Sequence, residues 1–216
     1  MITFKIQGAK YKLPTAWADV TYQQHTALLS LPNTLIDQIN LFTGIGLEKL
    51  QKSELKNLEK IALALSFINI PPDFTPGPKD IGKYLVPKDV TIESLGQFED
   101  LRGLCNKRPA NIDTTENRVL FCELCLEAAA IYVQKIKDGV YNSNNVPQVK
   151  DELRDECCLD IIQTGSFFLF KPLHSSMNMR DRFRMVIQRL RKLLQDLPGY
   201  QKSLDFLQHS SKPGKE

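Results

Sequence analysis

The stretch TENRVLFCELCLEAAAIYVQKIKDG, from Thr115 to Gly139, decides the fold of this chain. It is long, it is rich in strong helix formers, and it ends in glycine, the residue that most often closes a helix. Asp113 together with Glu116 is expected to cap its first turn. The stretch therefore predicts a long α-helix in the second half of the chain.

The N-terminal part predicts a small β-hairpin followed by a capped helix. ITFKIQGAKYKLP (Ile2–Pro14) alternates apolar and polar residues around a turn that contains glycine. A hairpin of this size needs a supporting surface, and Trp17 is expected to anchor that contact. Thr21, followed by Gln24 three positions later, predicts a capping box. His25, on the same helix, is expected at the surface.

The segments between this helix and the long one follow from spacing and from turn residues. TLIDQINLFTG predicts a helix closed by Gly44, and Ser53–Ile68 shows a serine cap and apolar residues at helical spacing. NIPPDFTPGPKD (Asn69–Asp80) contains four prolines and must be a loop, because proline interrupts regular structure. Tyr84–Thr91 reads as an extended piece before a helix in ESLGQFEDLRGLC, residues 93–105.

After the long helix, a loop at residues 140–147 leads to a predicted helix over residues 148–165, which ends at Gly165. The apolar segment SFFLFKPL is expected to be buried. Met179–Gly199 predicts an amphipathic helix that Pro198 and Gly199 stop. We expect a mainly α, multi-helix globular protein with a small N-terminal hairpin, organised as residues 1–68, a proline-rich arm at 69–87, a central helical domain at 88–172 and a basic C-terminal helix and tail at 173–216.

Asp-Val-Thr occurs twice, at residues 19–21 and 89–91, each time before a predicted helix. In this interpretation, each helix begins at the threonine of its Asp-Val-Thr. Either the chain contains a distant internal duplication, or it uses the same capping chemistry twice.

The charges of the chain are unevenly distributed. Residues 1–100 carry ten Lys, no Arg and eleven acids, whereas residues 101–216 carry eighteen Lys plus Arg and fourteen acids. In the last predicted helix, Phe183, Ile187, Leu190, Leu194 and Leu197 form one apolar stripe. Basic residues cover much of the remaining surface of this helix: Arg180, Arg182, Arg184, Arg189, Arg191 and Lys192. This face is either a solvated helix surface or a binding surface for DNA phosphates, an anionic membrane or an acidic partner, and a protein partner is favoured among the binding roles.

No pattern in the chain predicts an enzyme, a metal site or a cofactor. Cys122 and Cys125 with the adjacent pair Cys157 and Cys158 offer four thiols, but the first pair lies within a predicted helix and the second lacks a spacer. Core packing is therefore expected for these cysteines rather than zinc binding. The longest apolar runs are too short to cross a bilayer, and the chain starts without a signal-peptide pattern, so a cytosol-like compartment is expected.

Five motifs occur in one order along the chain: LPTAWADVTYQQHTALLSL, INLFTGIGLEKLQK, ALSFINIPP, ESLGQFEDLRGL and GSFFLF. They contain Trp-x-x-Val-Thr-x-x-Gln, Thr-Gly-Ile, Leu-Ser-Phe and Gly-x-Phe-Phe. This pattern resembles small proteins from the structural-gene modules of tailed double-stranded DNA phages of Bacteroidetes, including crAss-like phages. The resemblance spans about Leu13 to Phe170 and leaves the basic helix outside.

The resemblance implies a non-enzymatic component of a phage tail or neck that packs as a ring of identical subunits in the virion, after synthesis in the host cytoplasm. It would contact other copies of itself and other tail or neck proteins. The alternatives are a tail assembly chaperone that is absent from the virion and a nucleic-acid-binding module that uses the basic helix. The candidate interface pairs the proline-rich loop, with Ile70 and Phe74, with the basic face of a neighbour. This loop is expected to become ordered only against that neighbour.

Overall fold

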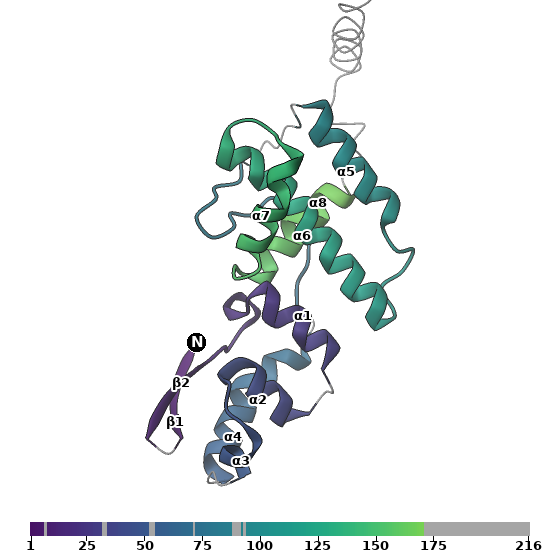
Figure 1. Cartoon of the computed structure of the whole chain (residues 1–216). Coiled ribbons are helices and arrows are strands. Elements are labelled where there is room, and N and C mark those ends of the chain that lie inside the picture. The colour runs from purple at the N-terminus through teal and green to yellow at the C-terminus, as the bar shows by residue number, and fades with distance from the viewer. Residues whose placement is uncertain are drawn as a thin grey trace, which may run out of the picture. The chain divides into compact units, whose positions relative to one another are not determined.

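The long helix predicted from the sequence is present in the computed structural model as α6, Thr115–Asp138 (Figure 1). It begins after Thr114, whose hydroxyl accepts a hydrogen bond from the backbone N–H of Asn117 at 3.2 Å. It ends at Gly139, whose φ of 74° lies in the left-handed region that favours glycine. The end of the helix is therefore confirmed. The prediction of Asp113 as its cap is wrong, because the residue directly before the first helical turn supplies the cap.

The structure describes residues 1–6, 8–31, 34–51, 55–70, 72–87, 92 and 94–170, which belong to one compact unit, Met1–Pro172. Over these residues the fold is mainly α-helical with a two-stranded N-terminal hairpin, which confirms the expected fold class (Figure 1). The remaining elements, in chain order, are β1 Ile2–Ile6, β2 Ala9–Leu13, the 3-10 turn η1 Trp17–Asp19, α1 Tyr22–Ser30, α2 Leu35–Thr43, α3 Leu47–Gln51, α4 Leu55–Ala64, η2 Leu65–Asn69, α5 Leu95–Lys107, η3 Ser143–Asn145, α7 Val146–Leu153 and α8 Cys158–Phe170.

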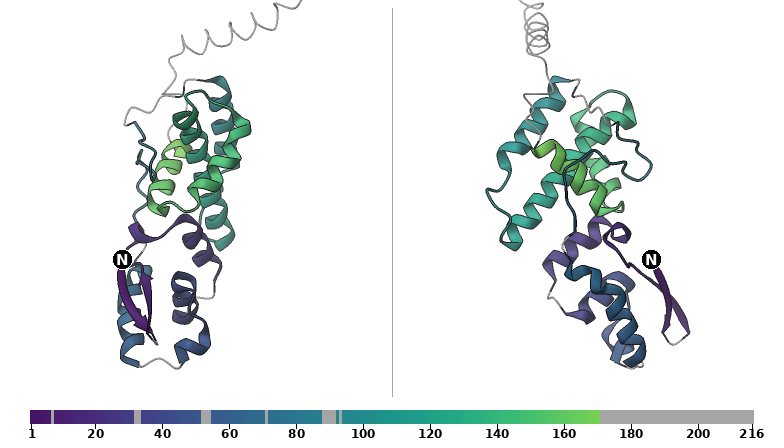
Figure 2. Two further views of the ribbon diagram at one scale, coloured as in Figure 1. Left: turned by 60° about the vertical axis from the view of Figure 1, so that its left-hand side comes forward. Right: turned by 180° about the vertical axis from the view of Figure 1, so that it is seen from behind.

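Helix α6 is the centre of the core, because most of its residues from Phe121 to Gln134 are buried, whereas Glu123 and Glu127 stay partly exposed on one face. Helices α1, α5, α7 and α8 pack against it, and Figure 2 shows this group of helices from two further directions. A helix with apolar residues over most of its surface is stable only when other elements enclose it. Its buried residues are Phe121, Cys122, Leu124, Cys125, Leu126, Ala128, Ala129, Ala130, Ile131, Tyr132, Val133 and Gln134.

The prediction of one helix over residues 148–165 is wrong, because α7 and α8 replace it. The break between them comes from pairing with the start of α1. The backbone N–H of Tyr22 donates to the carbonyl of Glu156 at 2.9 Å, and the N–H of Cys158 donates to the carbonyl of Val20 at 2.9 Å. Groups that would continue α7 are thus engaged by a distant part of the chain. A turn follows Leu153 instead.

Gly165 does not end a helix, since α8 continues through the apolar segment to Phe170. Ser166, Phe168 and Leu169 are buried, as the sequence predicts, whereas Phe170 is 51% exposed. The apolar residues of this segment therefore form the C-terminal turns of α8, not a separate connection.

The hairpin pairs β1 with β2 in antiparallel register, from Ile2 opposite Leu13 to Ile6 opposite Ala9. Ile6 and Leu13 are buried, and β2 contacts α2. The ring of Trp17 packs on other elements than the hairpin. It lies edge-to-face on His25 and Phe67, at centroid distances of 5.7 and 5.3 Å. Trp17 therefore ties η1 to α1 and η2, and α2 supplies a surface for the hairpin.

The local capping predictions for the first helices are confirmed where the residues are described. The Thr21 hydroxyl accepts from the N–H of Gln24 at 3.2 Å, and the Gln24 side-chain oxygen accepts from the N–H of Thr21 at 3.1 Å. Helix α2 ends at Gly44, with φ of 69°. Ser53 lies outside the described residues, so its predicted cap stays a prediction. The helix predicted after it is α4, which tightens into η2.

Residues 72–80 of the proline-rich loop have no regular structure but are bonded to α8. The Thr164 hydroxyl accepts from the backbone N–H of Lys79 at 3.0 Å and donates to the carbonyl of Lys79 at 3.2 Å. The N–H of Gly77 donates to the carbonyl of Gln163 at 3.1 Å. The expectation that this loop becomes ordered only against a neighbouring molecule is wrong for these residues, because α8 of the same chain already bonds the backbone of Gly77 and Lys79.

The second Asp-Val-Thr, at residues 89–91, lies outside the described residues. Helix α5 is capped by Ser94, whose hydroxyl accepts from the N–H of Gln97 at 3.1 Å. The interpretation in which this helix begins at Thr91 is therefore wrong, and the internal duplication stays a prediction. The C-terminal part of the chain, including the predicted helix Met179–Gly199, also lies outside the described residues.

Candidate protein-binding groove

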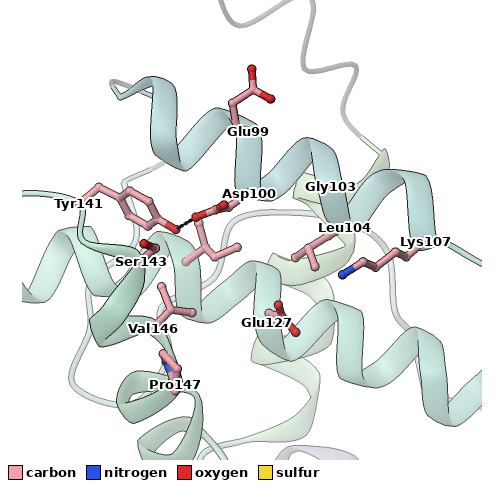
Figure 3. Close-up of a pocket in the computed structure, with 11 residues that line it drawn as sticks. Glu99, Asp100, Gly103, Leu104, Lys107, Glu127, Tyr141, Ser143, Val146 and Pro147 are labelled. Carbon is pink, nitrogen blue, oxygen red and sulfur yellow. Dashed lines mark hydrogen bonds between the residues drawn. The ribbon is translucent and has the colours of Figure 1, made fainter.

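An open groove of about 320 Å³ lies where α5, α6 and the start of α7 meet (Figure 3). Leu104, Ile131, Val146 and Pro147 give it an apolar lining. The other lining residues are Glu99, Asp100, Gly103, Lys107, Glu127, Tyr141 and Ser143. Three acidic residues and one basic residue thus surround an apolar floor.

Helical spacing explains why these side chains reach the same groove. On α5, Asp100 and Leu104 are four residues apart, and so are Glu99 and Gly103. On α6, Glu127 and Ile131 have the same separation. Two facing helices therefore each present an acidic residue and an apolar residue to the space between them, as Figure 3 shows for Asp100, Leu104 and Glu127.

The buried side chain of Gln134 shapes the loop that forms one end of the groove. Its side-chain oxygen accepts from the backbone N–H of Asn142 at 2.9 Å. Its amide nitrogen donates to the carbonyl of Val140 at 3.2 Å and to Asp138 Oδ2 at 3.0 Å. Because both ends of this fully buried amide are hydrogen-bonded, the loop has a defined path.

That loop carries Tyr141 to the groove, where its hydroxyl donates to the carboxylate of Asp100 (Figure 3). Burial, together with this hydrogen bond and the negative charge of Asp100, raises the pKa of Tyr141. The phenol therefore stays neutral and donates its hydrogen bond to Asp100. This contact links the loop to α5 across the end of the groove.

The acidic wall on α6 belongs to a wider set of charges. Lys150 Nζ lies 3.5 Å from Glu127 Oε2 and 3.1 Å from Glu123 Oε2. Arg154 also pairs with Glu123, at 3.5 Å. Glu127 therefore shares Lys150 with a second carboxylate, which leaves acidic character at the groove.

The two interface residues predicted on the proline-rich loop join one aromatic cluster. Ile70 is 67% exposed, and its carbonyl accepts from the indole N–H of Trp17 at 2.8 Å. Phe74 is half-buried, with its ring centroid 5.7 Å from that of His25. The structure thus connects Ile70 and Phe74 through Trp17 and His25. The predicted basic residues Arg180, Arg182, Arg184, Arg189, Arg191 and Lys192 lie outside the described residues.

His25 is buried, so its predicted surface position is wrong. Only 4% of the residue is exposed, its Nδ1 has no hydrogen-bond partner among the residues that the structure describes, and its ring packs edge-to-face on those of Trp17 and Phe74. Burial lowers the pKa of His25 to about 4, because the charged imidazolium would lose its solvation. Its aromatic neighbours come from separate segments, which explains why its burial could not be foreseen from α1 alone.

The predicted core position of the helical cysteines is confirmed. Cys122, Cys125 and Cys158 are buried, and Cys157 is half-buried. Burial raises the pKa of the Cys122 thiol to about 12, so this sulfur stays protonated and packs as a small apolar group. Within the described parts of the chain, no group of three or more His, Cys, Asp or Glu side chains is placed to hold a metal ion.

The groove is the feature that the sequence prediction missed. The four-residue separation of acidic and apolar positions on α5 was a possible signal. The same pattern also occurs on an ordinary solvated helix, and only the packing of α5 on α6 distinguishes the two.

No protein-family model, curated protein or solved structure matches this chain. Among the described helices, none combines the length and the apolar character needed to cross a membrane. The resemblance to phage structural proteins therefore stays a prediction.

Proposed function

We propose that this protein is a non-enzymatic structural component of a phage tail or neck that packs as a ring of identical subunits. The observation that carries the proposal is the groove between α5, α6 and α7, whose apolar floor and acidic walls suit side chains from a partner protein. A ring requires each copy to present two different patches, and an acidic groove provides one of them.

The positions of the motif residues are consistent with a resemblance at the level of the fold. Thr21 and Gln24 form the capping box of α1, and Gly44 ends α2. Phe67 packs on Trp17, and Phe168 packs on Tyr132 with ring centroids 4.7 Å apart. Residues that build helix ends and the core are the ones expected to persist between distant proteins of one fold.

Mass spectrometry of purified virions tests this function. We expect peptides of the protein in intact particles, at a constant copy number relative to the major tail protein. A protein that is abundant in infected cells but missing from purified particles would contradict the structural role and support the tail assembly chaperone. Salt-dependent binding to DNA, without incorporation into particles, would support the nucleic-acid-binding alternative.

A further inference from the structure

We propose that the groove binds the basic segment Arg180–Lys192 of a second copy of this chain, an inference that rests on the structural function proposed above. The groove presents the carboxylates of Glu99, Asp100 and Glu127 and one cation, Lys107. The segment contains six basic residues and one acidic residue. The two surfaces are complementary in charge, which favours encounter and fixes orientation.

The size of the groove defines what it accepts. A volume of about 320 Å³ accepts side chains of a partner but not an entire helix. In the predicted C-terminal helix, Ile187 follows Arg184 by three residues and precedes Arg191 by four, so the three share a face. The inferred arrangement places Ile187 on the apolar floor and the two arginines against the acidic walls.

The groove keeps two accessible carboxylates, Glu99 and Glu127, although its third, Asp100, accepts from the hydroxyl of Tyr141 and Glu127 lies 3.5 Å from Lys150. In the proline-rich loop, Asp73 Oδ1 already accepts the backbone N–H of Thr75 at 2.9 Å, and Asp80 Oδ1 accepts that of Val86 at 2.8 Å. Glu99 is exposed and Glu127 is 40% exposed along its side chain, so both are accessible to an incoming guanidinium. Contact between arginine and a carboxylate is often bidentate, which adds specificity to the attraction.

Charge reversal on each surface of the full-length chain tests the inference. One variant carries Glu99→Lys and Glu127→Lys, and the other carries Arg184→Glu and Arg191→Glu. Self-association is measured by sedimentation, and folding is checked by circular dichroism. We expect each variant to raise the dissociation constant at least about tenfold, and the chain with all four changes to regain wild-type association. If the groove variant does not fold, Glu99→Lys alone at its exposed position takes its place.

Mixing the two reversed variants tests whether the contact is between copies. The groove-reversed copy keeps a basic segment, which complements the acidic groove of the segment-reversed copy. The reversed groove and the reversed segment are complementary as well. We expect the mixture to associate where each variant alone does not. Wild-type protein that stays monomeric, reversed variants that associate normally, or a mixture that stays monomeric would each overturn the inference.

The self-association experiment and the virion experiment test different claims, so their outcomes can be told apart. If the wild-type protein is present in particles but the reversed variants associate normally, the structural function stands and the groove contact is wrong. If charge reversal and mixing behave as expected but the protein is absent from particles, the contact stands and the proposed function is wrong.

Discussion

Gly165 of α8 lies directly against the backbone carbonyl of Cys125 in α6, with no space for a Cβ atom between the two helices. Both residues are buried at the contact between the two helices. A glycine in the middle of a helix lowers helix propensity by about 1 kcal/mol relative to alanine. Close approach of the two backbones therefore explains why glycine occupies this position.

Gly165→Ala is expected to destabilise the protein by about 2 kcal/mol, because the clash is with backbone and no rotamer change relieves it. For a chain of this size, that is a fall in Tm of about 4–8 °C. Thermal unfolding followed by circular dichroism measures the change. Gly103→Ala is the matched control: Gly103 is also within a helix, but no atom of the described residues outside its own helical backbone lies within 4 Å of an added Cβ. We expect the control to be neutral or stabilising, and equal effects of the two changes would argue against tight packing at Gly165.

Lowering the pH is expected to weaken the fold through His25. The pKa of this imidazole is lowered from 6.5 to about 4 in the folded state. The unfolded chain therefore binds the proton first, and stability is lost as pH falls from about 6.5 toward 4. Between pH 7 and 5 this amounts to roughly 2 kcal/mol.

Urea unfolding of the wild type and of His25→Phe at pH 7 and pH 5 isolates this contribution. The variant lacks the titrating group and the unpartnered Nδ1 but keeps an aromatic ring beside Trp17 and Phe74. We expect a smaller pH dependence for the variant than for the wild type. The same loss of stability in both proteins would assign the pH effect to other groups.

The proline-rich loop gives a third prediction, because Thr164 holds it to α8. Thr164→Val removes the hydroxyl that exchanges hydrogen bonds with the backbone of Lys79 and leaves a backbone N–H without that partner, a cost of about 1–3 kcal/mol. Faster hydrogen exchange across residues 72–80 is expected. Thr75→Val is the control, since its hydroxyl bonds to Asp73 within the loop. If exchange is unchanged in the Thr164 variant, this contact does not order the loop.

Features that depend on neighbouring residues were predictable from the sequence. The capping box at Thr21 and Gln24, the end of α2 at Gly44 and the extent of α6 to Gly139 all follow from local chemistry. Propensity and capping operate within one or two turns, so a short window of sequence contains the relevant partners.

Features that depend on distant residues were not predictable. Helices α7 and α8 are separated because the backbone N–H of Tyr22 donates to Glu156 and that of Cys158 donates to Val20. These partners are more than a hundred residues apart in the sequence. His25 is buried by a ring from the proline-rich loop, and the groove exists only where α5 meets α6 and α7. In each case the partner is set by tertiary packing, which overrides the local pattern.

The end of the groove gives the last prediction, because its loop depends on Gln134. Gln134→Leu keeps the approximate volume of the side chain but leaves the N–H of Asn142 and the carbonyl of Val140 without this partner. We expect a loss of about 2–4 kcal/mol, together with faster exchange of the Asn142 amide.

The loop would then hold Tyr141 against Asp100 less firmly, and the pKa of Tyr141 is expected to move down toward its ordinary value as the phenol gains solvent. Ultraviolet titration of the tyrosines and hydrogen exchange measure these effects. Gln148→Leu, at an exposed position on α7, is the matched control and should leave both unchanged. A Gln134 variant that keeps wild-type stability and wild-type exchange at Asn142 would show that the loop keeps its path without this buried amide.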